Sequence, residues 1–200
     1  MKVTDNLKND ISNAPEWFFK SIESQVKKKK ITSADHAISY QTWGNKKHKN
    51  ILFFIHGTGA HMRWWDPIAP QFSKDSYVIA IDLPGMGDST HRENYSFASF
   101  AEAIIDILNH EELLELDKSI IFVGHSLGGH VAGFVASEHP RIVDYVVMID
   151  TPIRPPDYDY AKHKSTGPLR MIKYYKDKES IINRFRLMPA QECENDWYLR

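Results

Sequence analysis

Residues 119–131 read S-I-I-F-V-G-H-S-L-G-G-H-V, a short apolar run that leads directly into a serine held between glycines. The segment fits G-x-S-x-G with a strand before it and a helix after it, the arrangement called a nucleophile elbow. Glycines at 124 and 128 let the tight turn close, and a strained backbone lifts the Ser126 hydroxyl clear of the sheet. The alternative is a serine that only caps the helix beginning near Leu127. The pattern favours an exposed nucleophile.

Short apolar runs followed by loops recur along the chain. They cover 51–55, 77–81, 120–123 and 145–149. They show no alternation of polar and apolar residues, so both faces should be buried, as in a parallel sheet covered by helices. Helical patterns lie between them, at about 63–72, 97–116 and 127–138. We therefore predict an α/β fold with a doubly wound, mostly parallel sheet.

The segment before these runs predicts a lead-in and a hairpin. Residues 1–20 are polar and are expected to dock through Trp17, Phe18 and Phe19, and residues 26–43 read as two paired strands. The run Lys27–Lys30 falls on the first strand of this hairpin. Lysines on an edge strand discourage pairing with other molecules, so we interpret the run as edge protection or a solvated face rather than a binding site.

The chain beyond Pro152 has a different character. It is irregular at first, and then 169–175 (L-R-M-I-K-Y-Y) and 181–188 (I-I-N-R-F-R-L-M) carry apolar residues at helical spacing with basic residues opposite. This pattern fits the start of a helical lid, and a helix lying on a membrane surface is the alternative. We predict an α/β core over 1–152 and a partial helical cap over 153–200.

The loops that follow the four runs carry the chemistry. They read H-G-T-G-A-H (56–61), D-L-P-G-M-G-D-S (82–89), G-H-S-L-G-G-H (124–130) and D-T-P (150–152). In open α/β sheets, ligands bind beyond the carboxyl ends of the strands. These glycine-rich loops should meet at that edge, so we place the site there.

Composition excludes several classes of function. The formal net charge of −1 gives no global field for nucleic acid or an anionic membrane. No stretch of about 18 apolar residues is present, so we expect no membrane span. The single cysteine, Cys193, excludes an internal disulfide and suits a reducing cytoplasm. Neither a dinucleotide fingerprint nor zinc-type spacing occurs, so we expect no cofactor and no metal. The oligomeric state stays open.

Taken together, H-G-T-G, D-L-P-G-M-G-D-S, G-H-S-L-G-G and M-I-D-T-P resemble the α/β-hydrolase fold superfamily over about 26–152. The resemblance is closest to the branch with haloalkane dehalogenases, epoxide hydrolases and many serine esterases. It implies Ser126 as nucleophile, with the backbone N–H groups of Leu127 and Thr58 as oxyanion donors. Dehalogenases and epoxide hydrolases of this branch carry aspartate at the elbow, so Ser126 favours acyl transfer to water.

A serine needs a base to take its proton, and the family supplies a histidine late in the chain. Only His130, His139 and His163 follow Ser126. We expect His130 to lie on the flank of the helix, His139 at its C-terminus and His163 in a polar loop. The remaining candidates are equally unpromising: we expect a structural role for His56, a side chain turned away from the hydroxyl for His125, and surface positions for His61 and His91.

Asp150 is the candidate acid. It ends the strand after the elbow strand, where a minority of the family keeps its catalytic carboxylate. The alternative is a turn residue that opens D-T-P and hydrogen-bonds its own backbone.

The sequence thus predicts a serine hydrolase that acts on an ester or a related small acyl compound, impaired as it stands because the base is not at the family position. A ligand-binding protein on the same scaffold and an acyltransferase are the alternatives. We further expect 1–200 to be a fragment that turns over little or no ester. Its last strand, 145–149, is apolar on both faces yet would lie at a sheet edge, with the last strands of the fold absent.

Overall fold

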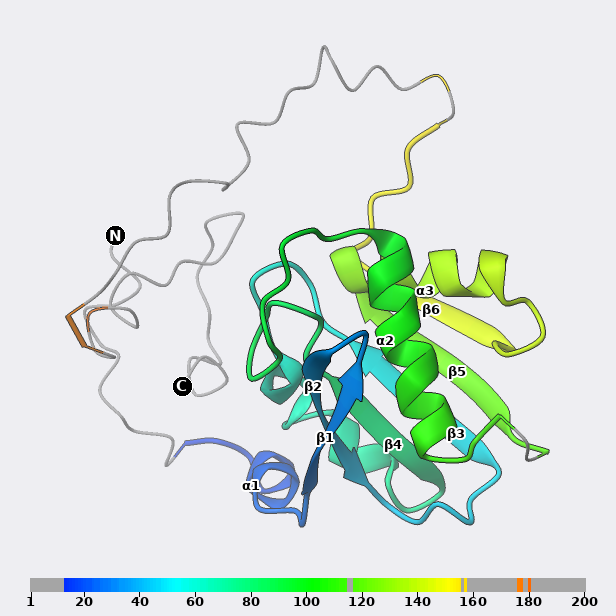
Figure 1. Cartoon of the computed structure of the whole chain (residues 1–200). Coiled ribbons are helices and arrows are strands. Elements are labelled where there is room, and N and C mark those ends of the chain that lie inside the picture. The colour runs from blue at the N-terminus through cyan, green and yellow to red at the C-terminus, as the bar shows by residue number, and fades with distance from the viewer. Residues whose placement is uncertain (1–12, 115–116, 156, 158–175, 178–179, 181–200) are drawn as a thin grey trace. The chain divides into compact units, whose positions relative to one another are not determined.

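Six strands form one mixed sheet in the order β1-β2-β4-β3-β5-β6 in the computed structural model (Figure 1). The structure describes residues 13–114, 117–155, 157, 176–177 and 180, and Trp17–Pro152 form one compact unit. The strands are β1 (Lys27–Ser33), β2 (His36–Trp43), β3 (Asn50–Ile55), β4 (Ser76–Ile81), β5 (Ser119–His125) and β6 (Tyr145–Ile149). The predicted hairpin and all four predicted apolar strands are confirmed.

The strand directions bring the functional loops to one edge of the sheet. Strand β3 runs parallel to both β4 and β5, and β5 runs parallel to β6. The register places Ile55 beside Ile81 and Gly124, so β3, β4 and β5 end at the same level. The hairpin strands β1 and β2 are antiparallel and extend the sheet beyond β4. The loops after these parallel strands therefore meet, as the sequence predicts.

Each face of the sheet has its own apolar cluster. Helices α2 (Phe97–His110) and α3 (Leu127–Glu138) pack on one face, where Ile104 and Val131 join a cluster with Phe53 and Phe122 of the strands (Figure 1). On the other face, two 3₁₀ turns, η1 (Met62–Trp65) and η2 (Ala69–Phe72), contribute Trp65 to a second cluster. The sheet is covered on both sides, as a doubly wound α/β fold requires.

The helix predicted over 63–72 is wrong. The chain forms the two short 3₁₀ turns instead, separated by Asp66, Pro67 and Ile68. Proline has no backbone N–H, so Pro67 and Pro70 deny the segment two of the hydrogen bonds that a continuous α-helix needs.

The helix predicted over 97–116 begins where expected but ends early, at His110. Glu112 adopts a left-handed conformation with φ 54°. Its amide donates to the Asn109 carbonyl at 2.8 Å, and the Leu113 amide donates to the Leu108 carbonyl at 2.9 Å. These two bonds form a Schellman motif, which ends the helix without the usual glycine.

The predicted lead-in contains one short helix, α1 (Glu16–Ile22). Phe18 is buried, whereas the Trp17 side chain remains substantially exposed. The burial of Phe18 is compatible with the expected docking of the lead-in, which stays a prediction. The expected cap helices at 169–175 and 181–188 lie outside the described residues.

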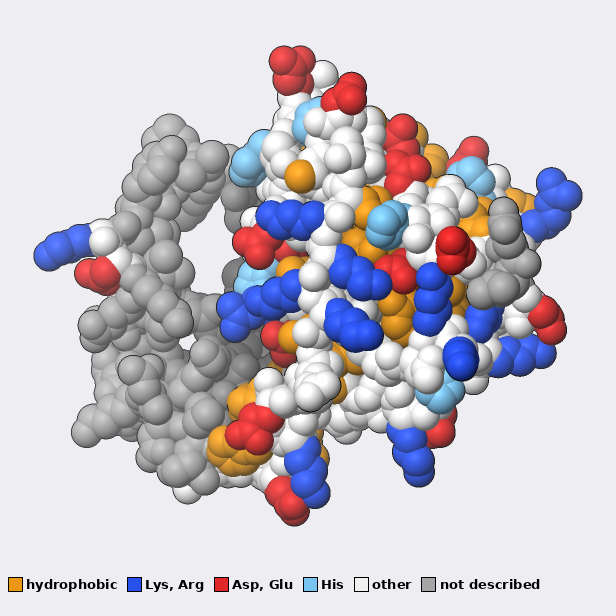
Figure 2. Space-filling model, turned by 60° about the horizontal axis from the view of Figure 1, so that its bottom comes forward, with side chains coloured by type: hydrophobic (Ala, Val, Ile, Leu, Met, Phe, Trp, Pro, Cys, Tyr) orange, Lys and Arg blue, Asp and Glu red, His pale blue; other side chains and the backbone are white. Residues whose placement is uncertain are grey.

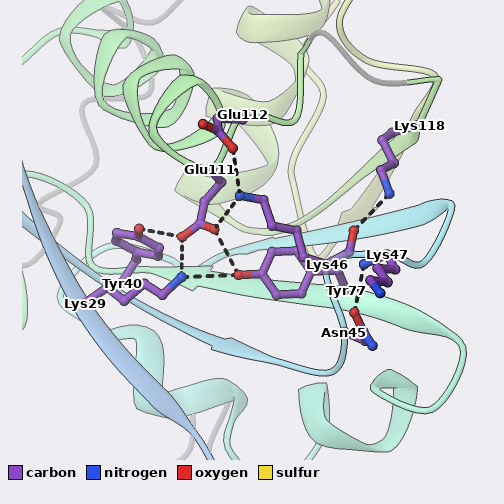
Figure 3. Close-up of polar contacts among 9 residues, drawn as sticks. All are labelled: Lys29, Tyr40, Asn45, Lys46, Lys47, Tyr77, Glu111, Glu112 and Lys118. Atoms are coloured by element: carbon purple, nitrogen blue, oxygen red, sulfur yellow. Dashed lines mark hydrogen bonds and ion pairs between the residues drawn. The ribbon is translucent and has the colours of Figure 1, made fainter.

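A buried carboxylate ties the end of α2 to the hairpin side of the sheet (Figure 3). One oxygen of Glu111 accepts hydrogen bonds from the Lys29 ammonium and the Tyr40 hydroxyl, both at 2.6 Å. The other accepts from the Tyr77 hydroxyl at 3.1 Å and lies 3.8 Å from the Lys46 ammonium. Burial opposes ionisation of Glu111, but the hydrogen bonds from Lys29 and Tyr40 outweigh it and hold the pKa of the carboxyl below its ordinary value.

Replacing Glu111 with glutamine is expected to lower the free energy of unfolding by about 3 kcal/mol at neutral pH, because it leaves the Lys29 ammonium without its anion. The depressed pKa of Glu111 means that its contribution is complete above the unfolded pKa of about 4.3. It is lost as the pH falls through the lower folded value. Urea unfolding of both proteins between pH 7 and pH 3 should show the difference shrinking in acid.

Glu112→Gln is the matched control for that experiment. The Glu112 side chain is 81% exposed and lies 3.6 Å from Lys46. Surface ion pairs of this kind contribute about 0–1 kcal/mol. Equal losses in the two variants would contradict the role that we assign to the buried carboxylate.

Lysines mark the edge strand β1, but one of them is not a solvated edge residue. The Lys29 side chain turns onto the α2 face and binds Glu111, a role that the run Lys27–Lys30 does not reveal by itself. Figure 2 shows lysine and arginine side chains spread across the face in view, with carboxylates between them. This mixture agrees with the small net charge of the chain.

The other edge of the sheet is apolar. Within the described part of the chain, β6 pairs only with β5. Tyr145, Val147 and Ile149 are 64%, 46% and 41% exposed. The expectation that both faces of this run are buried is therefore wrong within the described residues, and the expected apolar edge is observed.

Candidate active site

The chain turns sharply from β5 into α3 at Ser126. This residue has φ 51° and ψ −114°, a combination outside the regions that a non-glycine residue ordinarily adopts. Its amide donates to the Ile149 carbonyl at 3.0 Å, and its carbonyl accepts from the Gly129 amide at 3.0 Å. The side chain makes no capping hydrogen bond to α3. The backbone is therefore fixed on both sides while the hydroxyl stays uncommitted, which is unlike an ordinary helix cap.

The two glycines of the motif are required by close packing. A Cβ atom at Gly128 would overlap the carbonyl of Ile55 in β3, and one at Gly124 would overlap the backbone of Gly128. The turn thus fits only if the strand, the helix start and the neighbouring strand approach backbone to backbone. Glycine at both positions is what allows the tight turn to close, as the sequence predicts.

The loop after β3 lies beside the serine. A Cβ atom built on Gly57 would stand 3.3 Å from the Ser126 Cβ. Thr58 follows it and is exposed, and the Ala60 amide closes the turn on the Gly57 carbonyl at 3.2 Å. On the other side, Leu127 opens α3, and the first amides of a helix have no intrahelical partner. The loop that carries Gly57 thus lies against Ser126, and Leu127 begins the helix that follows it.

His56 connects the loop after β3 to the loop after β4 through hydrogen bonds of its imidazole ring. Its Nε2 accepts a hydrogen bond from the Leu83 amide at 3.1 Å, so the proton of the neutral ring is on Nδ1, which donates to the Gly57 carbonyl at 2.8 Å. The side chain is fully buried, and burial lowers its pKa. A neutral imidazole that bridges two loops is a structural residue, as expected for His56.

Asp82 organises two of the loops, a role that the sequence alone does not predict. Its buried carboxylate accepts from the Met62 amide at 2.6 Å and from the Asp88 amide at 2.8 Å. It thereby joins the start of η1 to the D-L-P-G-M-G-D-S loop. An aspartate directly after a buried strand, followed by two glycines, was the available signal.

No imidazole hydrogen-bonds the Ser126 hydroxyl among the described residues. His130 lies on the flank of α3, with its ring centroid 6.4 Å from that of Phe97, and His139 is the exposed C-terminal residue that follows α3. His61 and His91 are exposed in loops. His163 lies outside the described residues.

Asp150 and His125 approach each other beside the elbow. The His125 ring stacks on Trp64, with centroids 5.8 Å apart and planes 17° apart. Its Nε2 lies 4.0 Å from a carboxylate oxygen of Asp150, whose side chain is 91% exposed. Asp150 has φ 46°, and the next residue, Thr151, donates its hydroxyl to the Ser126 and Ile149 carbonyls at 3.3 and 3.2 Å. The D-T-P segment is therefore attached to the elbow.

Over the residues that the structure describes, no three His, Cys, Asp or Glu side chains come together as a metal site. No helix within those residues is long and apolar enough to cross a membrane.

A strained serine between a parallel strand and a helix, with a glycine loop of the neighbouring strand beside it, defines the class of α/β proteins with a nucleophile elbow. Residues 52–198 match the model of the alpha/beta hydrolase family. The chain belongs to this family, as the motifs predict.

Two curated relatives match over about half of this chain. A "Serine hydrolase-like protein" of Danio rerio is 33% identical over 111 residues, which cover 56% of this chain and 33% of that protein. A monoacylglycerol lipase of Mus musculus is 30% identical over 110 residues, covering 54% of this chain and 32% of that protein. The chain therefore spans about a third of the length of these relatives.

A solved structure gives the same picture of the fold. The thioesterase domain from the curacin biosynthetic pathway matches with a TM-score of 0.60 at 26% sequence identity. The match covers 70% of this chain and 51% of that domain.

Proposed function

We propose that the protein is a serine hydrolase that acts on an ester or a related small acyl compound through an acyl-enzyme at Ser126. The observation that carries this proposal is the backbone of Ser126, held at φ 51° with its hydroxyl free of any capping bond. Such strain costs on the order of 1–3 kcal/mol and persists where surrounding structure over-determines it, most often at functional sites. The names of the relatives, a hydrolase-like protein and a lipase, support the same class of reaction.

The proposed reaction has two steps. The Ser126 oxygen attacks the acyl carbonyl, its proton passes to a base, and the alcohol leaves with a proton. Water then attacks the acyl-enzyme and releases the acid. In both steps, negative charge on the carbonyl oxygen is stabilised by the backbone N–H groups of Leu127 and Thr58. The reaction needs no cofactor or metal.

The base is the component that the described residues do not provide. A serine hydroxyl without a base is a poor nucleophile, so turnover without one would stay near the level that an oxyanion hole and binding supply. That level is about 10³–10⁴ over the reaction in water. Asp150 is the proposed carboxylate partner of the base, because it follows β6 and is attached to the elbow through Thr151.

The same observation favours a second candidate function. A protein with this scaffold but without a base at Ser126 would bind an acyl compound and not turn it over. The intact glycines at 124 and 128 argue against this alternative, since a binding protein has no need for a strained serine. Transfer of the acyl group to an acceptor other than water is the third candidate from the sequence.

Covalent labelling tests the proposal. A fluorophosphonate probe should modify the longest natural form of the protein, and peptide mass spectrometry should place the adduct on Ser126. Binding of an acyl analogue without any adduct would instead support the ligand-binding alternative. An adduct on a different residue would contradict the assignment of the nucleophile.

A further inference from the structure

A groove of about 350 Å³ lies between α2 and α3, away from Ser126. Its apolar part consists of Ala98, Ala101 and Ile105 of α2 and Phe134 of α3. The two alanines leave the space open, because a larger side chain at either position would fill it. Phe97 stacks on Phe134 with centroids 5.8 Å apart and holds that ring in place. The volume is at the lower end of the roughly 300–1,000 Å³ that small-molecule sites occupy.

The charged residues around this groove are acidic. Glu102 and Asp106 of α2 and Glu138 of α3 line the groove together with His139, and no lysine or arginine lines it. Glu102 lies 3.6 Å from Arg92, whose guanidinium is nearly buried and also donates to the Ser33 carbonyl. Asp106 and Glu138 form no ion pair within the described chain. The groove therefore carries uncompensated negative charge in a chain whose net charge is only −1.

The direction of α3 adds to this charge. Glu138 and His139 stand at the C-terminus of the helix, where the free carbonyl groups carry a partial negative charge. A cation is favoured at that position. The Phe134 ring contributes in the same sense, because the face of an aromatic ring attracts cations.

We propose that the groove between α2 and α3 is a binding site for a small organic cation with an apolar or aromatic body. The body lies against Ala101, Ile105 and Phe134, and the positive group lies between Asp106 and Glu138. This site is separate from the proposed hydrolase function, and its test does not depend on Ser126.

Three indole derivatives of similar shape and different charge provide the test: tryptamine, tryptophol and indole-3-propionate. Each is titrated into the ¹⁵N-labelled full chain while amide chemical shifts are recorded. Tryptamine is expected to shift the amides of α2 and α3 around the groove and to bind about fivefold more tightly than tryptophol, with indole-3-propionate weakest. Equal affinities for the three compounds, or shifts elsewhere, would overturn the proposal.

Isosteric variants separate the charge from the shape of the groove. The double variant D106N/E138Q is expected to weaken tryptamine about tenfold and to leave tryptophol unchanged. Glu93→Gln removes one exposed carboxylate outside the groove and is expected to change neither affinity. If Glu93→Gln weakens tryptamine as much as the double variant does, binding reflects overall charge and the proposed site is wrong.

Discussion

Ester turnover is expected to fall by about 10⁶ when Ser126 is replaced with alanine, because removal of the nucleophile disables the catalytic unit as a whole. The effect belongs in kcat rather than KM, since the alanine variant keeps the groups that border the substrate. Residual activity should correspond to the proposed oxyanion donors Leu127 and Thr58 alone. The measurement is steady-state hydrolysis of a p-nitrophenyl ester by the longest natural form.

Ser137→Ala is the matched control for this prediction. Ser137 is an exposed serine in the last turn of the same helix, and its hydroxyl donates to the Phe134 carbonyl at 2.9 Å. Its loss should leave turnover unchanged. Circular dichroism should show both variants folded, since the Ser126 side chain makes no capping bond whose loss would destabilise α3. Comparable activity in Ser126→Ala and the parent protein would remove Ser126 from the mechanism.

The sequence was sufficient where a local pattern determines the structure. Four apolar runs without alternation predict parallel strands, and β3, β4, β5 and β6 form over those residues, although β6 is not buried among the described residues. The elbow was predictable for a similar reason, because Gly124 and Gly128 are required by atoms within or next to the motif. Backbone sterics and the apolar pattern of a strand depend on residues that are close in sequence, so both can be predicted from the sequence alone.

The remaining features depend on contacts between distant segments. Glu111 and Lys29 are 82 residues apart, and neither side chain indicates its partner in the sequence. Asp82 bonds the Met62 amide 20 residues away and thereby fixes the start of η1. The short turns over Met62–Trp65 and Ala69–Phe72 keep an apolar pattern that resembles a helix, although prolines interrupt the hydrogen bonds. The apolar periodicity predicts which residues are buried, but it does not predict which backbone N–H groups can form the hydrogen bonds of a helix.

The sequence predicts which residue types could form the site, but it does not predict which of them lie side by side. The contact between His125 and Asp150 joins the end of β5 to the end of β6, and Trp64 reaches the same place from η1. The order of the strands decides which loops meet. Without the strand order, the sequence therefore identifies candidate site residues but not the residues that they contact.

In the longest natural form, replacing Asp150 with asparagine is expected to lower steady-state ester turnover by about 10⁴, because the proposed role of this carboxylate is to hold the catalytic histidine in the correct tautomer. Asparagine is the informative substitution, since it tolerates the left-handed conformation of φ 46° as aspartate does. The contact with His125 at 4.0 Å is solvent-exposed, so its loss should not unfold the protein.

The control for this prediction is Asp88→Asn, which removes an exposed carboxylate on the loop after β4 and should retain full turnover. If Asp150 only shapes the D-T-P turn, turnover should fall less than about tenfold. That result would assign the acid to another residue and leave Asp150 as a turn residue attached to the elbow.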